Sequence, residues 1–163
     1  MGDCFANLRE ATALLSARLH VTAASPVYET APMYVENQPA FLNAAVVGAT
    51  SMSPMALLST LKEFERQIGR QRREINGPRE IDIDLIAYGR LSYSYFEGKE
   101  MLLIVPHPRV ADRRFVLQPL ADIAPDFQLP QIGVVKTLLD QTEHQRESVK
   151  KLENAFLPVS SLE

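Results

Sequence analysis

The sequence of 163 residues has a single cysteine, no long hydrophobic run and no strong excess of charge. Cys4 has no second cysteine with which to form an internal disulfide, so nothing here requires an oxidising compartment. The longest apolar runs, at 44–49 and 101–105, are much shorter than the roughly 20 residues of a membrane-crossing helix. The first twenty residues also lack the uninterrupted apolar stretch of a secretory signal. We therefore expect a soluble, cytoplasmic protein that does not bind membranes.

The net charge and the composition argue against several further classes of protein. A formal net charge of −3 gives no general attraction to nucleic acid or anionic lipid. Hydrophobic residues make up 46% of the chain and charged residues 23%, which is typical of a folded globular protein. Two folding units would each be too short to bury a core of their own. We expect one domain over residues 1–163 and no nucleic-acid partner.

Apolar periodicity places helices and strands along the chain. Leu8, Leu15 and Leu19 recur at helical spacing, which predicts a helix near the start of the chain. Ser53-Pro54 is typical of a helix N-terminus and predicts a second helix at 54–68. The remaining predictions are strands at 21–30, 41–50, 81–88 and 102–105, short helices within 109–123, and a surface turn at 90–98. The first two strands should form an antiparallel pair. This order predicts an α+β sandwich with helices packed on one sheet face.

Two carboxylates stand out in the predicted strand at 81–88. Asp82 and Asp84 are two residues apart, so they share one face of a strand, and Ile81, Ile83 and Leu85 share the other. Neighbouring carboxylates repel each other, and such a pair suits Mg²⁺ with bound phosphates. On these residues alone, the solvated face of an edge strand is an equally good interpretation.

The stretch before this strand is rich in arginine, with Arg70, Arg72, Arg73 and Arg79. Planar guanidinium groups can clamp a polyphosphate through paired hydrogen bonds and stabilise charge in a transition state. Together with a metal on the two aspartates, they would supply what phosphate transfer requires. The alternative is a solvated basic loop, which is the usual role of an arginine cluster.

These motifs resemble those of the 6-hydroxymethyl-7,8-dihydropterin pyrophosphokinase family. The run Gly-Pro-Arg-Glu-Ile-Asp-Ile-Asp-Leu-Ile at 77–86 is similar to the family signature. Further blocks follow the family's order and spacing over roughly residues 1–130, namely 28–32, 41–45, 69–70, 106–109, Arg113 and 115–120. The resemblance implies a ferredoxin-like fold and an enzyme of folate biosynthesis. That enzyme transfers the terminal diphosphate of ATP to the hydroxymethyl group of the pterin and releases AMP.

The resemblance also implies roles on the nucleotide side. Asp82 and Asp84 would hold two Mg²⁺ ions that bridge the phosphates of the co-substrate ATP. The phosphates would be contacted by Arg70, Arg79 and Arg113, and the nucleotide side would be completed by Arg72, Leu85 and His107. Outside this context, the sequence modestly favours an ordinary loop histidine between prolines over a phosphate contact for His107.

On the pterin side, the resemblance implies that Phe41 and Phe115 sandwich the ring. The Asn43 amide can donate and accept, which matches the mixed hydrogen-bonding edge of a pterin. Backbone groups of Thr30, Ala31 and Met33 would complete that edge. Taken separately, each phenylalanine is better explained as a core residue than as a ligand-binding one. Other enzymes of the folate pathway are the expected protein partners.

One departure from the family pattern leaves alternatives open. The family begins with a β-strand and a Gly-Ser-Asn segment, whereas Met1-Gly2-Asp3 here stands at the start of the first predicted helix. We therefore expect a sheet without the family's first strand. A non-catalytic relative that binds pterin or nucleotide is one alternative function. A ferredoxin-like module that binds nucleic acid is another, which the acidic net charge disfavours.

Overall fold

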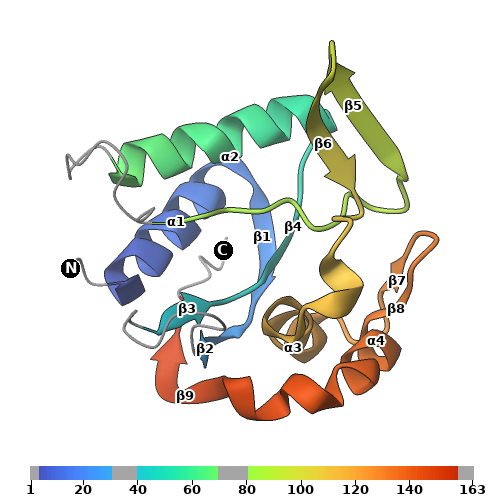
Figure 1. Ribbon diagram of the computed structural model, residues 1–163. Helices are drawn as coiled ribbons and strands as arrows, with labels where there is room; N and C mark the ends of the chain where they lie inside the picture. Colours follow the sequence, from blue (N-terminus) through green and yellow to red (C-terminus); the bar gives the residue numbers. More distant parts are fainter. Residues whose placement is uncertain (1–3, 31–39, 70–80, 158–163) are drawn as a thin grey trace.

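A computed structural model describes residues 4–30, 40–69 and 81–157 (Figure 1). It combines helices with antiparallel strands, which confirms the predicted α+β class. The elements in chain order are α1 (Cys4–Arg18), β1 (His20–Ala24), β2 (Pro26–Thr30), β3 (Phe41–Asn43), β4 (Val46–Ala49), α2 (Pro54–Gly69), β5 (Tyr93–Glu97), β6 (Glu100–Val105), η1 (Val110–Asp112), α3 (Arg114–Ile123), β7 (Gln128–Leu129), β8 (Gly133–Val134), α4 (Val135–Gln141), η2 (Glu143–Ser148) and β9 (Val149–Phe156).

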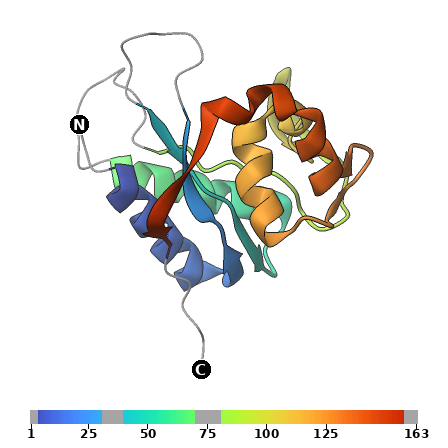
Figure 2. The ribbon, with the colours of Figure 1, turned by 90° about the horizontal axis from the view of Figure 1, so that it is seen from below.

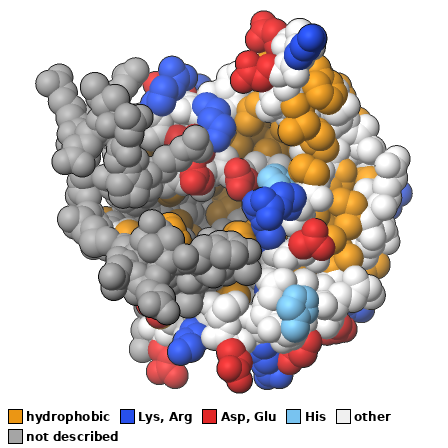
Figure 3. All heavy atoms as spheres, in the orientation of Figure 1, with side chains coloured by type: hydrophobic (Ala, Val, Ile, Leu, Met, Phe, Trp, Pro, Cys, Tyr) orange, Lys and Arg blue, Asp and Glu red, His pale blue; other side chains and the backbone are white. Residues whose placement is uncertain are grey.

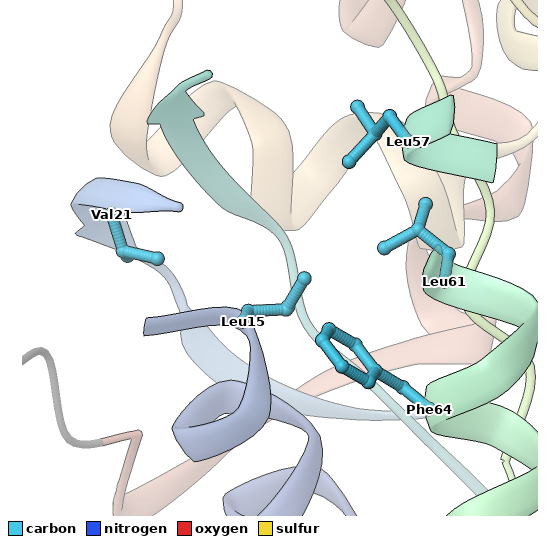
Figure 4. Close-up of a cluster of buried hydrophobic side chains, with 5 residues drawn as sticks. All are labelled: Leu15, Val21, Leu57, Leu61 and Phe64. Carbon is cyan, nitrogen blue, oxygen red and sulfur yellow. The ribbon is translucent and has the colours of Figure 1, made fainter. Parts of the chain in front are cut away.

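Helix α2 confirms the prediction for 54–68. The Ser53 hydroxyl accepts a hydrogen bond from the Ala56 N–H at 3.2 Å, so it caps the first turn. An apolar stripe at helical spacing then faces inward and packs against α1 and β1. Figure 4 shows this first core, in which five buried side chains converge from the three elements: Leu15, Val21, Leu57, Leu61 and Phe64.

The predicted antiparallel pairing of 21–30 with 41–50 is confirmed, although each strand is divided in two. β1 pairs with β4, and β2 pairs with β3. The division falls at Ser25, whose hydroxyl accepts the Ala45 N–H at 2.9 Å while its own N–H donates to the Ala45 carbonyl at 2.8 Å. β9 pairs with the second edge of β2, so the last described strand completes a three-stranded sheet.

A second core lies beyond β6 and involves α3, α4 and the short β7–β8 hairpin. Its buried members are Val110, Leu117, Leu129, Val135 and Leu138. Figure 2 shows α1 and α2 on one side of the central strands, with α3 and α4 on the other. Segment 81–88 contributes to both cores: Ile83 and Leu85 pack against the first, whereas Ile86 and Ala87 pack against the second.

Two local predictions are wrong. Residues 81–88 are not a strand, because among the described residues no neighbouring strand forms a ladder with them, and extended backbone without a ladder is not sheet. Residues 90–98 are more than a surface turn, because β5 lies within them and pairs with β6. The hairpin turns at Gly98, whose φ of +60° suits glycine. In the part of the chain that the structure describes, no helix is both long and apolar enough to cross a bilayer.

Candidate functional site

Asp82 and Asp84 are exposed, and the residues beside them are not. Ile81, Ile83 and Leu85 are partly buried, so exposure alternates along the segment although no ladder is formed. This alternation places both carboxylates on the solvent side, as the sequence pattern predicts for an extended chain. The side chain of Leu85 packs against the first core, so a contact between Leu85 and a nucleotide would come from its backbone.

A residue that the sequence did not reveal holds this segment in place. The Glu65 carboxylate, on α2, accepts a hydrogen bond from the Ile83 N–H at 2.6 Å and from the Lys62 ammonium at 2.9 Å. Its side chain is only 13% exposed. Ile83 lies between the two aspartates, so Glu65 fixes the peptide that sets the directions of both carboxylates.

His107 lies beside the same segment because its backbone N–H donates to the Ile86 carbonyl at 2.8 Å. The ring is partly buried, and its Nδ1 accepts the Arg109 N–H at 3.1 Å. A nitrogen that accepts carries no proton, so the neutral ring has its proton on Nε2. The Nε2–H is therefore the group that His107 can offer to a ligand.

The electrostatics of His107 identify its neighbours. Burial lowers the pKa of His107 below its ordinary value, and the positive charges of Arg113 and Arg109 lower it further. The Asp84 carboxylate acts in the opposite direction and raises that pKa. Asp84 and Arg113 therefore both lie close enough to His107 to act on the charge of its ring. Figure 3 shows acidic side chains beside a histidine and basic side chains at the edge of a hollow on this face.

Arg113 and Phe115 lie at the N-terminus of α3. Arg113 is the N-cap residue, and its carbonyl accepts the Leu117 N–H at 3.0 Å. Its guanidinium carbon lies 5.6 Å from the centroid of the Phe115 ring, which is a cation–π distance. This contact places a fixed positive charge and a flat aromatic surface next to each other.

Three further predicted pterin-binding residues, Thr30, Phe41 and Asn43, share one face of the β2–β3 pair. Phe41 and Asn43 alternate with Leu42 on β3, so they lie on the same face. The Asn43 amide donates to the buried Thr30 hydroxyl at 2.8 Å. Phe41 is 54% exposed, so the interpretation of this ring as a core residue is wrong.

Tyr28 connects this face to α3. It pairs with Asn43 across the ladder, and its hydroxyl donates to the Asp122 carboxylate of α3 at 2.7 Å. Burial raises the pKa of Tyr28 well above its ordinary value, and the Asp122 carboxylate adds to the shift. α3 contacts both β2 and β3. The elements that carry Phe41 and Phe115 are therefore packed together.

Five of the predicted site residues lie outside the described part of the chain. They are Arg70, Arg72 and Arg79 on the nucleotide side, and Ala31 and Met33 on the pterin side. Within the described ranges, no group of three or more His, Cys, Asp or Glu side chains forms a metal site. The two aspartates nevertheless fit Mg²⁺, which usually binds through one or two carboxylates together with waters and substrate phosphates.

The arrangement suits a ligand that carries both negative charge and an aromatic ring. Asp82 and Asp84 provide oxygen ligands for a cation, while Arg113 and the His107 Nε2–H can bind phosphate oxygens. Phe115 on α3 and Phe41 and the Asn43 amide on β3 present flat and polar surfaces, and α3 contacts β3. Such a combination can bring a polyphosphate and a planar heterocycle together.

Comparisons with known proteins agree with this chemistry. Residues 1–125 match the family model of 7,8-dihydro-6-hydroxymethylpterin-pyrophosphokinase. The chain is 43% identical over 125 residues to 2-amino-4-hydroxy-6-hydroxymethyldihydropteridine pyrophosphokinase of Bacillus subtilis, which covers 76% of the chain and 72% of that protein. It is 38% identical over 145 residues to the protein of the same name from Synechocystis, which covers 88% of the chain and 70% of that protein.

A eukaryotic relative is a larger protein. The mitochondrial folate synthesis bifunctional protein of Arabidopsis thaliana is 44% identical over 124 residues, which are 76% of the chain. The match spans only 22% of the length of that protein. The match to the family model ends at residue 125, so β7, β8, α4, η2 and β9 lie beyond it.

Proposed function

The chain belongs to the 7,8-dihydro-6-hydroxymethylpterin-pyrophosphokinase family, and on this basis we propose that it transfers diphosphate from ATP to the hydroxymethyl group of the reduced pterin. The products are AMP and the pterin diphosphate, an intermediate of folate biosynthesis. The observation that carries the proposal is the hydrogen bond from the His107 N–H to the Ile86 carbonyl at 2.8 Å. It places a ring that can bind phosphate beside the segment that carries Asp84, an oxygen ligand for a cation, and the positive charge of Arg113 also acts on this ring.

On the nucleotide side, Asp82 and Asp84 would hold two Mg²⁺ ions. When bound, these ions neutralise phosphate oxygens and favour attack at the β-phosphorus. Glu65 keeps both carboxylates directed to solvent through its hydrogen bond to Ile83. Arg70, Arg72 and Arg79 complete the phosphate clamp together with Arg113, and Leu85 contributes its backbone.

His107 acts as a neutral donor. Because its pKa lies below the ordinary value of 6.5, the ring is uncharged at neutral pH. Its Nδ1 is occupied by the Arg109 N–H, so the Nε2–H donates to a phosphate oxygen. A neutral donor binds phosphate without adding a third positive charge beside Arg109 and Arg113.

On the pterin side, Phe41 and Phe115 stack on the two faces of the ring. The hydrogen bond from Asn43 to Thr30 fixes the plane of the amide, so that its oxygen and its second N–H meet the polar edge of the pterin. Backbone groups of Thr30, Ala31 and Met33 complete this edge. Catalysis then consists of positioning the substrate hydroxyl and stabilising charge, with no covalent intermediate on the protein.

The proposal also covers the fold type, the number of domains and the location in the cell. We assign a ferredoxin-like architecture to a single domain over residues 1–163, and a cytoplasmic location. Association with other folate-pathway enzymes is consistent with the Arabidopsis relative, which is named a folate synthesis bifunctional protein.

The proposal is tested by identifying the nucleotide product. The full chain is incubated with ATP, Mg²⁺ and 6-hydroxymethyl-7,8-dihydropterin, and AMP and pterin diphosphate should form in equal amounts. The matched control is 6-methyl-7,8-dihydropterin, which lacks the hydroxyl nucleophile and should give no AMP. Formation of ADP would contradict the proposal. Binding of ATP and pterin without AMP would instead favour the non-catalytic alternative.

A further inference from the structure

The side chain of Gln145 binds the backbone on both sides of Arg113. Its Nε2 donates to the carbonyl of Asp112 at 2.9 Å, and its Oε1 accepts the N–H of Arg114 at 3.1 Å. The amide therefore bonds the residue before Arg113 and the residue after it. A single planar group that bonds both neighbours restricts rotation of the peptide units that flank Arg113.

Gln145 is itself held firmly within η2. Its N–H donates to the Thr142 carbonyl at 2.9 Å, and its carbonyl accepts the Ser148 hydroxyl at 2.7 Å. The side chain of Arg114 also bonds residues of α4 and η2. It is buried, and its guanidinium donates to the Leu139 carbonyl at 3.2 Å and to the Glu143 carboxylate at 3.1 Å. The clamp on Arg113 is thus anchored in α4 and η2.

We propose that Gln145 is a positioning residue for Arg113, which it aims from a segment beyond the part that matches the family model. The proposal rests on the function proposed above, in which Arg113 binds the phosphates of ATP. Arg113 is the N-cap residue of α3 and has no side-chain capping bond, so the backbone bonds to Gln145 help to set its direction. Fixing the backbone in advance reduces the conformational freedom that Arg113 loses when it binds a phosphate.

The clamp itself is tested without turnover by amide hydrogen exchange measured by NMR. The Arg114 N–H should be protected in the wild-type chain. Gln145→Leu keeps a side chain of similar volume but removes both bonds, so exchange of this amide should accelerate about tenfold or more. The control is Gln128→Ala, because Gln128 is exposed and, in the described part of the chain, its Nε2 donates only to the carbonyl of the next residue. Exchange at Arg114 that is unchanged in Gln145→Leu would overturn the clamp.

The effect on catalysis is tested by a double-mutant cycle. Gln145→Leu should lower kcat/KM for ATP about tenfold and leave KM for the pterin unchanged. In an Arg113→Ala background, the same substitution should have no further effect, because Gln145 acts through Arg113. Equal and independent losses in both backgrounds would show a general structural role and overturn the proposal.

The two readouts separate this inference from the proposed function. If the wild-type chain forms no AMP and binds no ATP, the proposed function fails, and with it the role of Gln145 in binding ATP. The exchange experiment still decides whether Gln145 fixes the backbone around Arg113. If AMP forms and the cycle shows independent losses, only the inference about Gln145 fails.

Discussion

The Glu65 carboxylate accepts the backbone N–H of Ile83 at 2.6 Å, at the peptide between Asp82 and Asp84. No strand in the described part of the chain forms a ladder with 81–88, so at this position a side chain takes the place of a strand neighbour. The contact joins the buried face of α2 to the exposed pair of carboxylates. It therefore couples the packing of the first core to the geometry of the proposed metal site.

Removal of this contact should affect both stability and activity. Glu65→Ala leaves the Ile83 N–H without its partner, which should cost roughly 1–2 kcal/mol in the free energy of unfolding measured in urea. AMP formation should fall about tenfold, because the two carboxylates lose their fixed direction. Glu63→Ala is the matched control, since Glu63 on the same helix is 49% exposed and, among the described residues, forms an ion pair only with Arg66. It should cost less than about 1 kcal/mol. Equal effects of both substitutions would argue against a special role for Glu65.

The charge relations around His107 can be measured by NMR titration of its ring. Asp84 raises the pKa of His107, so Asp84→Asn should lower that pKa further. Arg113 lowers it, so Arg113→Ala should raise it. If neither substitution moved the His107 titration, the three residues would not form one site.

The same shift gives stability a defined pH dependence. The pKa of His107 is lower in the folded chain than the ordinary value of 6.5, so the unfolded chain binds more protons between these two values. The contribution of the neutral ring to stability is therefore intact above pH 6.5 and is lost as the pH falls through the folded-state pKa. His107→Gln should remove this part of the pH dependence, as measured by urea unfolding across the range. An unchanged pH profile would show that His107 is not buried in its neutral form.

Loss of the hydrogen bond from Asn43 to Thr30 should change KM for the pterin and leave KM for ATP unchanged. Thr30→Val keeps the shape of the side chain but removes the acceptor of the Asn43 amide, so the amide loses its fixed plane. KM for the pterin should rise about fivefold to tenfold, while KM for ATP stays unchanged. Thr22→Val on β1 removes an exposed hydroxyl that donates to the Val47 carbonyl, and it should change neither constant. A rise in both Michaelis constants would indicate general damage to the β2–β3 pair.

The sequence predicts those helices and strands that depend on residues close together in the chain. Helix α2 follows from Ser53-Pro54 and from its apolar stripe, and both lie within the helix itself. The break at Ser25 was not predicted, because it depends on Ala45, which lies twenty residues away in the sequence. The alternation around Asp82 correctly predicted which side chains face solvent. It could not predict the absence of a ladder, which depends on neighbouring strands.

The residues that the sequence did not reveal act through the backbone of distant segments. Glu65 lies 18 residues from Ile83, and Gln145 lies 31 residues from Arg114. In the sequence, Glu65 stands three residues after Lys62 and resembles an ordinary surface ion pair. Gln145 stands in a polar stretch with no apolar periodicity. The side chains expected to contact the ligands are predicted from their resemblance to a family pattern, whereas the side chains that hold their backbone in place are seen only in the fold.

The most direct test of the account is whether AMP formation depends on Asp84. The wild-type chain and Asp84→Asn are compared with ATP, Mg²⁺ and the pterin alcohol, and Asp126→Asn, an exposed aspartate paired with Lys136, is the control. We expect Asp84→Asn to lower the rate of AMP formation by about a hundredfold or more, because a carboxylate that holds the cation is lost, and Asp126→Asn to stay within about twofold of wild type. A rate for Asp84→Asn equal to that of the control would contradict the proposed site.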